Sequence, residues 1–215
     1  MLVTNFKTYP ESTGDGALSL ARIHERINKE TMSEIAIAVQ PADILSVAHL
    51  KVSVFAQHVD PVSPGRNTGY ITPECVKQAG ADGVLLNHSE HPMKPWEVEK
   101  AIKICKKLGL KTLVFVSTML EATDLKSFKP DYLAYEVPEL IGTGKPISKE
   151  KPGEIREFVE KISDTNIVPL CGAGISHGKD VKTAKKLGTK GVVVASAIVK
   201  AKNPKKVIEA MVRNL

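Results

Sequence analysis

Residues 83–116 read GVLLNHSEHPMKPWEVEKAIKICKKLGLKTLVFV, and this stretch contains the structural unit that recurs along the whole chain. It begins and ends with short apolar runs, 83–87 and 113–116, that are long enough for a buried strand but too short for a helix. Between them, apolar residues recur at the spacing of one helix face, at Val98, Ile102, Cys105 and Leu108. The stretch therefore predicts a strand, a helix that covers it, and a second strand.

Eight apolar runs of this kind alternate with amphipathic segments from one end of the chain to the other. They lie at 2–6, 35–39, 52–56, 83–87, 113–116, 132–135, 167–171 and 191–194. Such alternation predicts an α/β protein with a parallel sheet whose strands are buried on both faces. Eight units can close into an eight-stranded parallel (β/α)8 TIM barrel, whereas the alternative, an open doubly wound sheet, more often has five or six strands.

Two details refine this prediction. No Ser/Gly-rich linker or change in composition divides the chain, so we expect residues 1–215 to form a single domain. Pro169 interrupts the seventh run, and proline has no N–H to donate to a sheet. We therefore expect either a short strand at that point or a neighbouring carbonyl that lacks its partner.

The composition excludes several classes of protein. The 215 residues are 42% hydrophobic and 25% charged, which is ordinary for a globular domain and unlike a disordered, collagen-like or disulfide-stapled chain. No apolar run approaches the roughly 18 residues of a spanning helix. Residues 1–7 do not have the pattern of a secretory signal. We expect a soluble, cytoplasmic protein that does not bind membranes.

The cysteines and the net charge carry little functional signal. Cys75, Cys105 and Cys171 are far apart and form no C-x-x-C pair, so we expect neither a zinc site nor a disulfide framework, and Cys105 fits a core position. The formal charge of +6 comes from basic residues spread along helical segments, with only 5% aromatic residues. A solvated exterior explains this charge better than a nucleic-acid-binding surface does.

The chemistry of a barrel of this type lies at the carboxyl ends of its strands. There the sequence places a lysine, a histidine and a carboxylate, Lys7, His88 and Glu136. It also places three turns of small residues, 142–144, 172–174 and 195–196, whose backbone N–H groups can approach an anion closely. A base, a group that polarises an oxygen and an anion site would together suit proton transfer on a phosphorylated substrate.

Each of these signals has a plainer interpretation. A single glutamate at a strand end is usually solvated, and a histidine there is more often a hydrogen-bonded structural group. The turn 172–174 resembles the start of a dinucleotide fingerprint, but the next glycine, Gly178, breaks the G-x-G-x-x-G spacing. Only their joint occurrence at the ends of the right strands favours an active site.

Four motifs together resemble the triosephosphate isomerase family. They are Asn5-Phe6-Lys7 after the first run, Asn87-His88-Ser89-Glu90 after the fourth, Tyr135-Glu136 before Ile141-Gly142-Thr143-Gly144, and Cys171-Gly172-Ala173-Gly174 after the seventh. They occur in the family's order and span essentially the whole chain. The resemblance implies a cofactor-free, metal-free enzyme that interconverts dihydroxyacetone phosphate and D-glyceraldehyde 3-phosphate through an enediolate, a step of glycolysis and gluconeogenesis.

The resemblance also implies a role for each matching residue. Glu136 matches the family's base, and His88 matches the neutral imidazole that polarises the carbonyl. Lys7 and Asn5 match residues that contact the reacting oxygens and the negative charge, and Glu90 matches a carboxylate that orients Lys7. The substrate and its phosphate would be held by Asn5, Phe6, Lys7, Ile141, Gly142, Gly174, Ala195 and Ser196.

Residues 137–145 match the family's lid, which closes over the substrate and excludes water. Pro138 restricts one end of this segment, and Gly142 and Gly144 allow bending near the other. The commoner form of the family is longer, has tryptophan in the lid, serine at the position of Gly174, and two glycines in place of Ala195-Ser196. These departures resemble the compact archaeal branch, which implies a homotetramer.

Two other functions remain open at this level. Another phosphosugar-using barrel, such as an epimerase, would need a different acid–base pair, typically two carboxylates, and in some cases a metal. A barrel that only binds, for example one that uses its basic surface for nucleic acid, would have no need of both His88 and Glu136.

Overall fold

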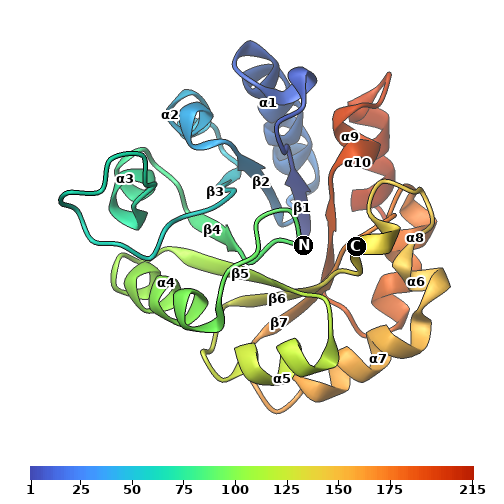
Figure 1. The fold of residues 1–215 in the computed structure, drawn as a ribbon. Coiled ribbons are helices and arrows are strands. Elements are labelled where there is room, and N and C mark those ends of the chain that lie inside the picture. The colour runs from blue at the N-terminus through green and yellow to red at the C-terminus, as the bar shows by residue number, and fades with distance from the viewer.

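Eight parallel strands close into a barrel in the computed structural model, which describes all residues 1–215 (Figure 1). Each strand pairs with the next in sequence order, and β8 returns to pair with β1, through Leu2↔Val192 and Thr4↔Val194. The strands are β1 (Leu2–Asn5), β2 (Ile35–Val39), β3 (Ser53–Ala56), β4 (Gly83–Leu86), β5 (Lys111–Val116), β6 (Tyr132–Tyr135), β7 (Val168–Cys171) and β8 (Gly191–Val194). The predicted (β/α)8 barrel is confirmed.

Helices form a ring outside the strands (Figure 1). The α-helices are α1 (Asp15–Thr31), α2 (Ile44–Val47), α3 (Pro73–Gln78), α4 (Pro95–Lys107), α5 (Met119–Lys126), α6 (Ile147–Glu150), α7 (Pro152–Lys161), α8 (Gly178–Lys186), α9 (Ser196–Val199) and α10 (Pro204–Val212). Short 3₁₀ turns are η1 (Pro10–Ser12), η2 (Pro41–Asp43) and η3 (Pro138–Leu140). Gly109 and Gly188, just past the ends of α4 and α8, have φ of +67° and +105°, the left-handed conformation that favours glycine there.

The core has two layers because successive side chains of a strand point to opposite faces. Inside the barrel lies a cluster of eleven buried hydrophobic residues that includes Val3, Leu85 and Phe115. Between the strands and the helices lies a larger cluster of 48, which takes the alternate positions, such as Leu2 and Val84, and the fully buried Cys105. Both faces of the sheet are therefore covered, as the continuous apolar runs predict.

Pro169 lies at the edge of a short ladder. Its carbonyl accepts from the Lys190 N–H at 2.8 Å, and β7 pairs with β8 only from Leu170 and Cys171 onward. The first of the two expected outcomes holds, because the missing N–H lies where this pairing has not yet begun.

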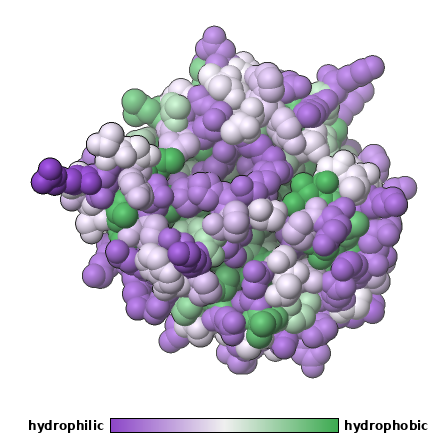
Figure 2. All heavy atoms as spheres, viewed as in Figure 1, coloured by the Kyte–Doolittle hydropathy of each residue, from purple (hydrophilic) through white to green (hydrophobic).

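The chain contains no helix long and apolar enough to cross a membrane. Viewed from the side of Figure 1, its surface is largely hydrophilic, with small hydrophobic patches scattered over it (Figure 2). In a parallel barrel the carboxyl ends of all strands open on the same side. The loops that leave these ends therefore meet around one region, although they are distant in sequence.

Candidate active site

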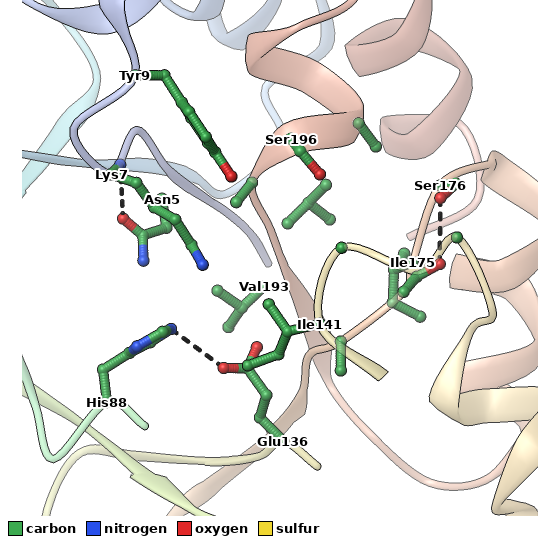
Figure 3. Close-up of a pocket in the computed structure, with 17 residues that line it drawn as sticks. Asn5, Lys7, Tyr9, His88, Glu136, Ile141, Ile175, Ser176, Val193 and Ser196 are labelled. Carbon is green, nitrogen blue, oxygen red and sulfur yellow. Dashed lines mark hydrogen bonds and ion pairs between the residues drawn. The ribbon is translucent and has the colours of Figure 1, made fainter. Parts of the chain in front are cut away.

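One cavity receives side chains from the loops after β1, β4, β6, β7 and β8 (Figure 3). Nine of the predicted site residues line it, namely Asn5, Lys7, His88, Glu136, Ile141, Gly142, Gly174, Ala195 and Ser196. Glu90 lies just outside, where it contacts Lys7. Barrel closure brings these residues together at the ends of strands that are far apart in sequence.

His88 and Glu136 face each other across the floor of this cavity (Figure 3). Both side chains are buried, and His88 Nε2 lies 3.1 Å from Glu136 Oε2. The contact is not aligned with the ring N–H, so Oε2 has no true hydrogen bond in the fold. A buried carboxylate oxygen without a donor is a strong acceptor, which is what a base needs.

One hydrogen bond to the His88 ring indicates which of its nitrogens carries the proton. The backbone N–H of Glu90 donates to His88 Nδ1 at 3.1 Å, so Nδ1 must carry a lone pair and no proton. The imidazole is then neutral, with its one proton on Nε2, the nitrogen that faces Glu136 and the cavity. This is the form in which the ring can donate to a substrate oxygen.

The segment that carries His88 is held from both sides. Asn87 adopts a left-handed conformation, with φ of +56°, and its side chain donates to the Phe115 carbonyl and accepts from the Met93 N–H. The His88 ring packs edge-on against the Phe115 ring, with 4.8 Å between centroids. Tight packing and backbone contacts therefore fix where Nε2 points.

Lys7 is positioned by an unusual backbone turn. Its φ is +50°, rare for a residue with a side chain, and Asn5 Oδ1 accepts the Lys7 backbone N–H at 3.0 Å. The Gln57 side chain donates to the Lys7 carbonyl at 2.8 Å. The ammonium reaches into the cavity, where it also pairs with Glu90 Oε1 at 2.6 Å. Because Glu90 is more than half exposed, its charge is screened and that of Lys7 remains available.

Backbone N–H groups without a protein partner also line the cavity. The N–H groups of Gly142, Gly174, Ala195 and Ser196 donate to no group of the protein, although all four residues line the cavity. The Ile141 N–H, by contrast, is used by the Pro138 carbonyl at 3.1 Å, so Ile141 contributes its side chain only. Several free N–H groups near one point form a site for an anion such as phosphate.

Residues 137–145, the predicted lid, are hydrogen-bonded only within themselves. Leu140, Ile141 and Thr143 donate backbone N–H groups to carbonyls of residues 137–140. The hydrogen bonds that attach this segment to the barrel lie just outside it. The Glu136 N–H donates to the Val116 carbonyl, and the Ile147 N–H donates to the Ala173 carbonyl. Gly142 and Gly144 both have φ of +73°. The segment is thus a compact unit with an attachment point at each end, as a hinged lid requires.

The lining of the cavity differs from the sequence analysis at several positions, two of which are Phe6 and Tyr9. Phe6 does not line the cavity; its side chain is fully buried and its ring lies 5.7 Å from that of His24 in the core. Tyr9 does line it, with its hydroxyl pointing into the cavity on the side of Ser196 (Figure 3). Lys200 Nζ lies 4.2 Å from the centroid of the Tyr9 ring. The only signal for Tyr9 in the sequence is its place two residues after Lys7.

Comparison with known proteins is consistent over the whole chain. A family model described as triosephosphate isomerase matches residues 1–211. A protein of Methanobacterium bryantii named triosephosphate isomerase is 44% identical over 218 residues, which cover 100% of this chain and 96% of that protein. One of Methanocaldococcus jannaschii with the same name is 41% identical over 216 residues and covers 99% of both chains.

A solved structure is similar in fold. The crystal structure of triosephosphate isomerase from Bartonella henselae aligns with a TM-score of 0.71, at 19% sequence identity, over 92% of each chain. At that identity the similarity concerns the architecture of the barrel.

Proposed function

Because this chain belongs to the triosephosphate isomerase family and is an isomerase, we propose that Glu136 and His88 interconvert dihydroxyacetone phosphate and D-glyceraldehyde 3-phosphate. The observation that carries this assignment is their opposition across one cavity, with 3.1 Å between Glu136 Oε2 and His88 Nε2. A carbon acid that enters the cavity next to this pair would meet a base at its C–H bond and a donor at its oxygens.

The reaction needs one proton to move between adjacent carbons. Glu136 takes the proton from the carbon beside the carbonyl, and the electron pair of that C–H bond forms the carbon–carbon double bond of an enediolate. The neutral His88 donates Nε2–H to the oxygen that gains charge and passes a proton between the two oxygens. Glu136 then returns its proton to the neighbouring carbon, so no cofactor is needed.

The charge of the substrate is balanced at two places. Lys7 offers a fixed positive charge beside the reacting oxygens, and Asn5 holds the turn that presents it. The free N–H groups of Gly142, Gly174, Ala195 and Ser196 bind the phosphate dianion. Binding energy from the phosphate can then orient the reacting carbons against Glu136.

Closure of the lid, residues 137–145, completes the site. An enediolate that carries a phosphate loses that phosphate readily when it is exposed to water, so water must be excluded while the intermediate exists. A segment bonded only within itself can move as one piece about its two attachment points.

The assembly and the compartment remain predictions. We propose a homotetramer, and support for association comes from large hydrophobic side chains on the surface, among them Trp96 and Leu120, which are 56% and 72% exposed. Light scattering of the purified protein would give the mass directly, and a monomer would contradict this prediction. We propose that the protein is located in the cytoplasm, and fractionation of cells would test this.

A coupled assay of triose phosphate interconversion, run in the presence of a metal chelator, tests the proposed activity. Glu136→Asp withdraws the carboxylate by about one methylene, and misplacement by ~1 Å can reduce turnover about a hundredfold. The matched control is Glu99→Asp, the same change at an α4 glutamate that is paired only with Lys103. Near-parental turnover of Glu136→Asp would overturn its assignment as the base, and an inactive parent would overturn the function.

A further inference from the structure

Asp180 is a buried carboxylate that joins three separate segments. It lies in the first turn of α8 and is only 1% exposed. Its Oδ2 accepts the backbone N–H groups of Ser176 at 3.2 Å and His177 at 2.9 Å. Its Oδ1 lies 2.8 Å from Lys149 Nζ and has no hydrogen-bond partner in the fold. The Lys149 ammonium is therefore the group that compensates this oxygen.

The two sides of Asp180 lead to two parts of the active site. Ser176 lines the cavity and belongs to the loop after β7, the same loop that contains the free N–H of Gly174. Lys149 lies in α6, which begins two residues after the lid ends. Helices α6 and α8 lie side by side at the edge of the barrel (Figure 1). One carboxylate thus contacts both the anion-binding loop and the far attachment of the lid.

Other contacts join the same two segments. The Ile147 N–H donates to the Ala173 carbonyl at 3.2 Å, and the Ser148 hydroxyl donates to the Asp180 carbonyl at 3.4 Å. Gly174 packs so closely on the Lys145 carbonyl that any side chain there would clash. The end of the lid and the loop after β7 therefore share an interface, and the Lys149–Asp180 pair is its only ionic contact.

We infer that the Lys149–Asp180 ion pair is a positioning device that couples closure of the lid to alignment of the anion-binding loop. This inference rests on the proposed function, since it assumes that the lid closes over a phosphorylated substrate. A buried carboxylate that loses its cation is strongly destabilised. The pair therefore keeps α6, where the lid is attached, in register with Asp180, and Asp180 in turn holds the backbone of Ser176 and His177.

A simpler role explains only part of this geometry. An aspartate in the first turn often caps its own helix, and the Oδ2 contact with the His177 N–H is of that kind. Capping does not need Lys149, because it uses the other oxygen. Lys149 is itself about half exposed, so its removal leaves no cavity in the core.

The test compares Lys149→Met with Lys103→Met, a matched change at an exposed α4 lysine that is paired with Glu99. Each variant is assayed with triose phosphate and with D-glyceraldehyde, which has the reacting carbons but no phosphate. We expect Lys149→Met to lower kcat/KM for triose phosphate about fivefold. Turnover of D-glyceraldehyde, which does not use the anion-binding loop, should stay unchanged, and Lys149→Arg should restore most of the loss.

A second variant separates positioning from simple loss of positive charge. Asp180→Asn removes the partner but makes the region more positive, so charge alone would strengthen binding of a dianion, whereas loss of positioning would weaken it. The ratio of activities on the two substrates does not depend on how much of the variant is folded. An equal loss on both substrates, no loss at all, or tighter binding by Asp180→Asn would each overturn the inference. An inactive parent would instead overturn the proposed function.

Discussion

The α-carbon of Gly172 lies directly against the Glu136 carboxylate, so that a methyl group at position 172 would clash with Oε1. The Gly172 N–H also donates to the Tyr135 carbonyl at 3.0 Å, which fixes the backbone at this point. The φ of Gly172 is not positive, so the position requires glycine for space and not for conformation. The loop after β7 thereby sets the place of the carboxylate as well as the anion site.

Gly172→Ala should displace the Glu136 carboxylate and lower kcat. Since a shift of ~1 Å can reduce turnover about a hundredfold, we expect a loss of about that size, with a smaller change in KM. The control is Gly153→Ala in α7, where an added methyl group meets nothing within 4 Å. Steady-state kinetics with triose phosphate measures both. Parental kcat in Gly172→Ala would show that Glu136 does not act from the position seen here.

Lys7→Ala should mainly weaken binding of phosphorylated substrates and of anionic inhibitors. The ammonium is the only cationic group among the residues that line the cavity. A hydrogen bond to a charged group contributes about 1.5–3 kcal/mol, which corresponds to a rise in KM of about tenfold to a hundredfold. Lys182→Ala, an exposed position on α8, serves as the control. Unchanged affinity and turnover in Lys7→Ala would remove Lys7 from the site.

His24 should make the stability of the protein depend on pH. Its ring is fully buried, with Nδ1 2.8 Å from the Leu20 carbonyl and Nε2 2.9 Å from the Thr4 hydroxyl, and the neutral ring satisfies both contacts by donating from Nδ1 and accepting at Nε2. Burial lowers the pKa of His24 from 6.5 to about 4. The unfolded chain therefore binds a proton between these values and the folded chain does not. The free energy of unfolding should fall by about 2–3 kcal/mol as the pH drops from 7 to 4.5.

Urea unfolding at pH 7 and pH 4.5 measures this difference. His24→Gln cannot titrate in this range, so its stability should fall less than that of the parent over the same interval. The control is His49→Gln, at an exposed position, and its free energy of unfolding should fall by as much as that of the parent. If His24→Gln loses as much stability as the parent, the pH dependence does not come from His24.

The cysteine beside the anion-binding loop should be chemically inert. Cys171 is fully buried, and burial raises the pKa of its thiol to about 12, so it carries no thiolate at neutral pH. Burial raises the pKa of Cys105 to about 12 in the same way, whereas Cys75 is exposed. A thiol reagent should modify Cys75 alone in the folded protein and all three residues after unfolding. Loss of activity in step with modification of Cys171 would contradict this.

The apolar runs of the sequence coincide with the eight strands to within a residue or two, and the differences have a common cause. The first run extends to Phe6, whereas β1 ends at Asn5, and β5 begins at Lys111, two residues before its apolar run. Strand ends depend on pairing with the neighbouring strands, as in the register Gly83↔Lys111. A run of side chains along one strand does not contain this information.

The residue types in the sequence located the candidate site, but they did not give its geometry. The placement of Lys7, His88 and Glu136 at strand ends is visible in the sequence because a parallel barrel opens all its strands on one side. The bond from the Glu90 N–H to His88 Nδ1, which makes the ring neutral, depends on local backbone conformation. Tyr9 was missed for the same reason, since nothing in its sequence position shows where its hydroxyl points.

By itself, then, the sequence determined the order of strands and helices and which polar residues stand at the strand ends, and it favoured a closed barrel over an open sheet. These follow from hydrophobic periodicity, which is local along the chain. Only the tertiary structure decided the 3.1 Å between His88 and Glu136, the contact between Gly172 and Glu136, and the Lys149–Asp180 pair. Each of these joins residues from different loops, and their relative positions are set by packing of the whole barrel and not by any one segment.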